Sequence, residues 1–106
     1  MDDEQQFLTQ VVHRLTTWSS PARVIVFGSV ATGTATADSD LDLLVVIDGV
    51  TDVRRESVRL RHVLGDIGMP IDVIVMSTER FEETKDVIGG IAYPAHKYGR
   101  VIYEAA

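Results

Sequence analysis

A glycine, a serine and two aspartates stand where they could bind a phosphate group and a divalent metal ion. Gly28-Ser29 follows the apolar run 24–27, and ten residues later Asp40-Leu41-Asp42 opens a second apolar run. Glycine lets the backbone turn sharply and lets a ligand approach it closely. The serine hydroxyl and the backbone N–H groups of such a turn could hold the oxygens of a triphosphate.

Asp40 and Asp42 are two residues apart at the start of an expected strand, so their carboxylates should project from the same face. Neighbouring carboxylates repel each other and favour a cation between them. Oxygen ligands of this kind suit magnesium. Two such ions about 3.5–4 Å apart can clamp the attacking and leaving oxygens of a phosphoryl transfer. The pair therefore predicts a magnesium site with catalytic carboxylates.

A third aspartate, Asp72, lies inside the apolar run 71–76. A carboxylate there is costly to bury unless it is paired or binds a metal ion. Consecutive strands usually lie close together, so we expect Asp72 beside Asp40 and Asp42. It would then be a metal ligand and the base that accepts the proton of an attacking hydroxyl. Each motif alone is common as a turn or a solvated strand end, but their combination favours the metal site.

The hydrophobic pattern indicates the elements that must position these residues. We expect helices over 5–18, 52–65, 92–98 and from Ser77 or Thr78 to about 88, and strands over 24–27, 41–47, 71–76 and 100–103. Residues 30–39 should form a short helix or turn and then a loop. This order predicts an α/β fold, a small mixed sheet with flanking helices, in which strand 41–47 is central and strand 71–76 lies beside it.

The same pattern predicts which helix faces are buried. On the first helix, residues at spacings of four and three should pack inward: Phe7, Val11, Leu15 and Trp18. On the helix over 52–65 the inward residues should be Val58, Leu60, Val63 and Leu64. That helix also carries arginines that should form a solvated face, from which some could reach a phosphate or a partner: Arg54, Arg55, Arg59 and Arg61.

Composition limits the remaining possibilities. The 106 residues suffice for one domain over 1–106 and are too few for two. The formal net charge of −6 argues against a broad nucleic-acid surface, but not against a nucleotide whose charge a metal ion balances. Cysteine is absent, which excludes disulfides. The acidic start and the short apolar runs lead us to expect a cytoplasmic protein without a signal peptide or membrane span.

Taken together, Gly28-Ser29, the ten-residue spacer, Asp40-x-Asp42 and the later Asp72 resemble the minimal nucleotidyltransferases of the DNA polymerase beta-like superfamily. The ending Tyr-Gly-Arg-Val-Ile-Tyr-Glu adds to the resemblance, which covers nearly the whole chain. It implies the polymerase beta-like nucleotidyltransferase fold, with ATP or another nucleoside triphosphate held at Gly28 and Ser29. It also implies one or two Mg²⁺ ions at the three aspartates, and transfer of a nucleoside monophosphate, AMP in the expected case, to a hydroxyl.

Many members of this family are antitoxins paired with a small helical toxin of the HEPN type, and some add AMP to a toxin tyrosine. The resemblance therefore implies a HEPN-type toxin as partner in a hetero-oligomer. Two alternatives stay open: an antitoxin that acts by contact alone with little or no catalysis, and a transferase for a small molecule such as an antibiotic. The short chain counts against the second alternative, because it leaves little room for another substrate-binding domain.

The loop after the serine departs from the family pattern. Typical members read Gly-Ser-x-Ala-Arg-Gly, whereas this chain reads Gly28-Ser29-Val-Ala-Thr-Gly33. No Lys or Arg lies between Arg23 and Arg54. Because phosphoryl transfer depends mainly on positioning and charge stabilisation, a missing cation would weaken nucleotide binding or slow the transfer.

Overall fold

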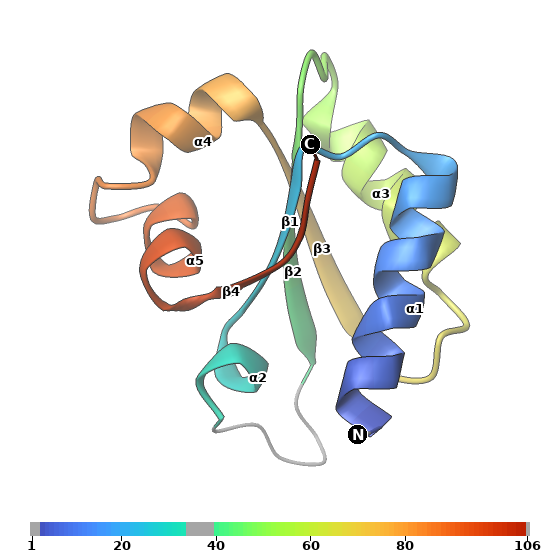
Figure 1. Ribbon diagram of the computed structural model, residues 1–106. Helices are drawn as coiled ribbons and strands as arrows, with labels where there is room; N and C mark the ends of the chain where they lie inside the picture. Colours follow the sequence, from blue (N-terminus) through green and yellow to red (C-terminus); the bar gives the residue numbers. More distant parts are fainter. Residues whose placement is uncertain (1–2, 34–39, 106) are drawn as a thin grey trace.

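The computed structural model describes residues 3–33 and 40–105 (Figure 1). Its elements, in chain order, are α1 (Asp3–Trp18), β1 (Arg23–Phe27), α2 (Ser29–Thr32), β2 (Leu41–Ile47), α3 (Val53–Val63), β3 (Ile71–Ser77), α4 (Thr78–Thr84), α5 (Ala92–Tyr98) and β4 (Arg100–Glu104). These bounds match the expected ones closely, except at the end of α4. The short helix expected after Ser29 is α2, and the loop expected beyond it, over 34–39, lies outside the described residues.

The four strands form one mixed sheet in the order β3-β2-β1-β4. β1 pairs with β2 and β4 in antiparallel fashion, and β2 pairs with β3 in parallel. A parallel pair needs a crossover connection, and α3 provides it. The α/β architecture is therefore confirmed, with β2 inside the sheet and β3 beside it.

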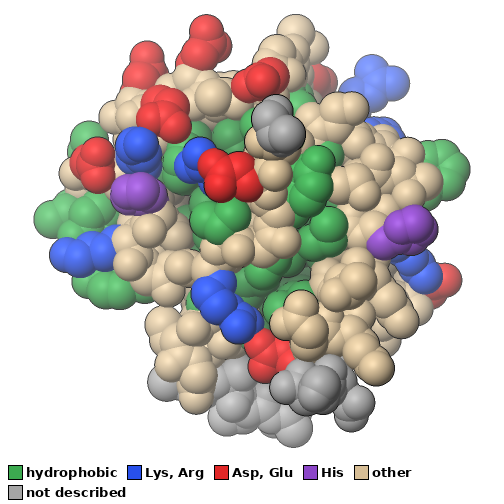
Figure 2. All heavy atoms as spheres, in the orientation of Figure 1, with side chains coloured by type: hydrophobic (Ala, Val, Ile, Leu, Met, Phe, Trp, Pro, Cys, Tyr) green, Lys and Arg blue, Asp and Glu red, His purple; other side chains and the backbone are tan. Residues whose placement is uncertain are grey.

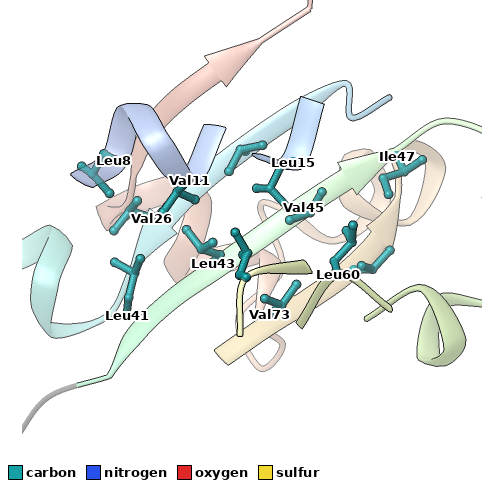
Figure 3. Close-up of a cluster of buried hydrophobic side chains, with 13 residues drawn as sticks. Leu8, Val11, Leu15, Val26, Leu41, Leu43, Val45, Ile47, Leu60 and Val73 are labelled. Atoms are coloured by element: carbon teal, nitrogen blue, oxygen red, sulfur yellow. The ribbon is translucent and has the colours of Figure 1, made fainter. Parts of the chain in front are cut away.

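Helices cover both faces of the sheet, which explains why β2 is apolar along nearly its whole length. α1 and α3 lie on one side of the sheet and α4 and α5 on the other (Figure 1). Alternate residues of β2, from Leu41 to Ile47, pack with α1 and α3 (Figure 3), whereas Leu44 and Val46 pack with α4 and α5. Asp42 is the one residue of this strand that is not fully buried.

The buried side of α1 differs from the expected one. Leu8, Val11 and Leu15 are buried, whereas Trp18 is 61% exposed. The last turn of α1 lies against the polar side of α3 rather than against the sheet, since Arg59 donates a hydrogen bond to the Trp18 carbonyl at 2.8 Å. The expectation that Trp18 packs inward is therefore wrong.

Val58 of α3 was also expected to face inward, and it is 45% exposed. Its neighbour Ser57 faces β3, because its hydroxyl accepts a hydrogen bond from the Val75 N–H at 3.0 Å. One residue further along a helix turns the side chain by about 100°, which directs Val58 away from the sheet. Leu60 and Leu64 are buried as expected.

α4 ends at Thr84, before the expected end near residue 88. The helix starts as expected, with the Ser77 hydroxyl accepting a hydrogen bond from the Arg80 N–H at 3.1 Å. Beyond Thr84, the side chains of Val87 and Ile88 are exposed, and Figure 2 shows exposed hydrophobic side chains at the left, over the segment that joins α4 to α5. Without a core to pack against, these residues gain no burial energy from continuing the helix.

Among the described residues, none of the helices is long and apolar enough to cross a membrane.

Candidate functional site

The register of three strands places Asp42 at the centre of the candidate site. Asp42 lies opposite Phe27, the last residue of β1, and opposite Asp72 on β3. Strand alternation puts Asp42 on the same face as Leu44 and puts Asp72 on the same face as Ile74, the face covered by α4 and α5. The two carboxylates are therefore neighbours on one face, as the sequence predicted.

Gly28 turns the chain away from β1 directly beside Asp42. Its backbone has φ 76° and ψ −154°, a region that is essentially restricted to glycine. A Cβ atom built at this position would lie 2.3 Å from Oδ2 of Asp42. Ser29 then begins α2, which ends at Gly33 in a left-handed conformation. The Gly-Ser turn therefore lies against the Asp42 carboxylate, on the side opposite to Asp72.

Asp40 directly precedes β2 and is exposed. The start of β2 is tied to the start of β3 by a hydrogen bond from the Leu41 N–H to the Pro70 carbonyl, 3.0 Å long.

Burial raises the pKa of the Asp42 carboxyl above its ordinary value, and the negative charges of Asp72 and Asp40 raise it further. The three aspartates thus interact electrostatically, and a cation among them would relieve the repulsion.

An arginine that the sequence placed on a solvated helix face reaches this site. Nη2 of Arg61, on α3, lies 3.5 Å from Oδ1 of Asp72 and 3.5 Å from the Val73 carbonyl oxygen. Because α3 covers the other face of the sheet, the Arg61 side chain passes around the outer edge of β3. Four arginines of α3 have similar sequence surroundings, so the pattern alone could not single out Arg61.

The ligand chemistry of the site fits a hard divalent cation, although the carboxylates are not gathered around one point. Within 3–33 and 40–105, no three acidic or histidine side chains lie close enough together to hold a metal ion. Three carboxylates nevertheless provide the oxygen ligands that magnesium prefers. Asp40 and Asp72 are exposed, so their side chains can turn toward Asp42 without opening the core.

Comparison with known proteins identifies relatives of this chain. Residues 6–93 match a family model described as a nucleotidyltransferase domain. A crystal structure of a Sulfolobus solfataricus protein assigned as a nucleotidyltransferase has 17% identity and a TM-score of 0.62, with 93% of this chain and 78% of that one covered. A toxin–antitoxin structure with AMP-PNP has 17% identity and a TM-score of 0.60, with 92% and 73% covered. At this identity both show the fold alone. No curated protein matches the chain.

Proposed function

Because the chain belongs to the nucleotidyltransferase domain family, we propose that it is a magnesium-dependent nucleotidyltransferase that transfers AMP from ATP to a hydroxyl group of a partner protein. One observation carries this proposal: Asp42 lies between the Gly28-Ser29 turn on one side and Asp72 on the other. This order separates a nucleotide side from an acceptor side, with a carboxylate between them where the α-phosphate of the transferred AMP would lie.

On the nucleotide side, the Gly28-Ser29 turn is the part of the site that can hold the triphosphate. Gly28 has no side chain, so phosphate oxygens can come close to its backbone. The Ser29 hydroxyl can donate a hydrogen bond to one of them. No Lys or Arg lies between Arg23 and Arg54 to assist this loop, so the charge of the triphosphate must be balanced from elsewhere.

Magnesium would provide that charge. Asp40, Asp42 and Asp72 would hold one or two Mg²⁺ ions, which neutralise charge on the phosphates and on the leaving group. The raised pKa of Asp42 supports this assignment, since burial and like charges gather where a cation is expected.

On the acceptor side, Asp72 is the base. The oxygen of the acceptor hydroxyl attacks the α-phosphorus of ATP, and its proton passes to the Asp72 carboxylate. The bond between the α-phosphorus and the α–β bridging oxygen breaks, and pyrophosphate leaves. Asp72 is half exposed at the edge strand β3, so an acceptor carried on another protein can reach it.

We further propose that the acceptor is a tyrosine of a HEPN-type toxin and that the chain is the antitoxin of this pair in the cytoplasm. The structural similarity to a toxin–antitoxin structure with AMP-PNP supports the antitoxin part of this proposal, and the HEPN type and the tyrosine are taken from the family resemblance. AMP-PNP is an ATP analogue, which favours ATP as the nucleotide. Modification of the toxin would then be the means by which this chain neutralises it.

The experiment combines the purified protein with ATP, Mg²⁺ and the product of the neighbouring reading frame, and measures the intact mass of that product. Wild type should add one or more AMP units. Asp42→Asn and Asp72→Asn should add none. Asp86→Asn is the matched control, because Asp86 is an exposed aspartate outside the three strands of the site, and it should act like wild type.

The result also separates catalysis from binding. If wild type and both site variants bind and silence the partner equally without a mass gain, the chain is an antitoxin that acts by contact and the catalytic proposal fails. If Asp72→Asn abolishes the mass gain while Mg·ATP still raises the melting temperature, the base assignment is supported, because a ligand that binds the folded state must stabilise it.

A further inference from the structure

We propose that Arg61 is a positioning residue that holds the Asp72 carboxylate at the edge of the sheet, away from Asp40 and Asp42, until magnesium binds. This inference rests on the proposed function, because it concerns the same metal site. It goes beyond that function by naming a residue outside the sheet that controls how readily the metal binds.

The ion pairs of the described residues single out Arg61. Among the ion pairs of the described residues, only the pair between Arg61 and Asp72 contains one of the three site aspartates. Arg59 on the same helix pairs instead with Glu56 and bonds to the Trp18 carbonyl. If the four arginines of α3 only faced solvent, they would have equivalent surroundings. In the structure, Arg59 and Arg61 have different partners.

The framework around Arg61 fixes where its guanidinium can reach. Leu60 and Leu64 are buried in the core on either side of it in the sequence, so the last turns of α3 cannot move freely. One turn earlier, Ser57 accepts the hydrogen bond from Val75 at the same outer edge of β3. Arg61 in turn donates to the Val73 carbonyl, two residues before Val75. The guanidinium therefore contacts Asp72 from the side that faces away from β2 and Asp42.

This position explains two features of the site together. The three carboxylates interact electrostatically, and yet no three of the described acidic side chains are gathered for a metal ion. The strand register keeps Asp72 beside Asp42, and a guanidinium on the far side of Asp72 attracts that carboxylate outward, so the two features hold at once. Side chains that are 51% and 50% exposed make a weak ion pair, so a divalent cation shared by three carboxylates can displace it.

The competition predicts a measurable effect on magnesium affinity. Without Arg61, the Mg²⁺ ion no longer competes with the guanidinium for the Asp72 carboxylate. It is also no longer repelled by a positive charge near the site. The Kd for Mg²⁺, fitted from the dependence of melting temperature on MgCl₂ concentration, should therefore be about two- to five-fold lower for Arg61→Gln than for wild type, as expected for the loss of an exposed ion pair. Arg61→Lys, which keeps the charge, should lie between the two.

The experiment is a thermal-unfolding titration with MgCl₂ and no nucleotide. Arg59→Gln is the matched control, since it removes an arginine two residues away that has no contact with the site aspartates, and it should titrate like wild type. A double-mutant cycle of Arg61→Gln and Asp72→Asn then measures their coupling in EDTA and in saturating Mg²⁺. The coupling should change the unfolding constant by about two- to five-fold in EDTA and vanish in magnesium.

Each outcome decides the matter. Equal or weaker magnesium response in Arg61→Gln overturns the proposal, and weaker Mg·ATP binding in that variant would indicate that Arg61 contacts the nucleotide instead. If the coupling persists in magnesium, Arg61 stabilises the edge of β3 whether or not the metal is bound, and the proposal is wrong. Absence of any magnesium response in wild type without nucleotide also overturns this inference, whereas the proposed function is decided separately by the transfer of AMP in the presence of ATP and Mg²⁺.

Discussion

The space that a side chain at position 28 would fill is occupied by the carboxylate of Asp42. A Cβ atom at Gly28 would lie 2.3 Å from Oδ2 and 3.2 Å from Cγ of Asp42. Gly28 directly follows β1, and Asp42 lies on the neighbouring strand β2, opposite the last residue of β1. The Gly-Ser turn and the Asp-x-Asp motif therefore form one unit in space, and changing the first must disturb the second.

Gly28→Ala should destabilise the protein by about 1–3 kcal/mol, because alanine is strained at φ 76° and ψ −154°. The added methyl group also displaces the Asp42 carboxylate, so the rise in melting temperature with Mg·ATP should be lost. Denaturant unfolding and a thermal-shift assay measure the two effects.

Gly33→Ala separates backbone strain from the clash. Gly33 also has a positive φ, 79°, but a Cβ atom there would meet no atom of residues 3–33 or 40–105 within 4 Å. It should cost about 1–2 kcal/mol, the penalty of a left-handed alanine, and leave the Mg·ATP response intact. If both variants lose the rise in melting temperature with Mg·ATP, backbone strain at the ends of α2, rather than contact with Asp42, controls nucleotide binding.

Asp42→Asn should raise the melting temperature slightly at neutral pH in EDTA. Burial first, and then the charges of Asp72 and Asp40, raise the pKa of Asp42, so the ionised group opposes folding above that pKa. As the pH falls through the raised pKa, Asp42 takes up a proton in the wild type, and the difference between the two proteins should disappear. Thermal unfolding between pH 3.5 and about 7 follows this change.

Asp66→Asn provides a control of opposite sign. The hydrogen bond and charge of Arg14 lower the pKa of the Asp66 carboxyl. This carboxylate therefore contributes stability above its unfolded pKa, and the contribution is lost as the pH falls through the folded value. The variant should be slightly less stable than wild type at neutral pH. If both variants shift in the same direction, general charge effects outweigh the local surroundings.

The sequence predicted the strands of the site well because their signal is local. The run 41–47 is apolar on both faces, which is the pattern of an interior strand, and it is found as β2 without a change of bounds. Asp72 was correctly placed beside Asp42, because consecutive strands usually lie close together. The position of β4 beside β1 had no such local signal, since it depends on contacts between distant parts of the chain.

The buried face of α1 and the partner of Arg61 could not be predicted from the sequence, because both depend on the position of the sheet relative to the helices. The expected set of residues 7, 11, 15 and 18 fits a helical spacing as well as the set that contacts the core, which is 7, 8, 11 and 15. Only the position of the sheet decides between them. The contact of Arg61 with Asp72 likewise requires the edge of β3 to lie beside the last turn of α3. Which aspartates bind a metal ion stays a prediction.

Exchange of Trp18 for alanine tests the corrected face of α1. Because Trp18 is mostly exposed, Trp18→Ala should cost about 0.5 kcal/mol or less. Leu15→Ala, three residues earlier and fully buried, should cost about 2–5 kcal/mol. Urea denaturation of both variants gives the comparison. If Trp18→Ala costs more than about 2 kcal/mol, the Trp18 side chain is packed in the core and the corrected face of α1 is wrong.

Gly99 is required for a different reason from Gly28. It joins α5 to β4, and its φ of −82° is open to any residue, so no backbone strain is involved. A Cβ atom there would lie 2.4 Å from the Ala95 carbonyl oxygen, 2.8 Å from Cγ2 of Ile25 and 2.8 Å from the Val26 carbonyl oxygen. Two of these three atoms belong to the backbone and cannot turn aside, so α5 would have to move away from β1.

Gly99→Ala should therefore destabilise the protein by about 1–3 kcal/mol, the usual cost of overpacking. Gly90→Ala is the matched control, because a Cβ atom at Gly90 meets no described atom within 4 Å and its φ is not in the left-handed region. That variant should be neutral or slightly more stable, since alanine restricts the unfolded chain. Denaturant unfolding measures both. Equal stability of the two variants would mean that α5 is free to shift from β1, and that the tight contact at Gly99 does not fix the C-terminal segment against the sheet.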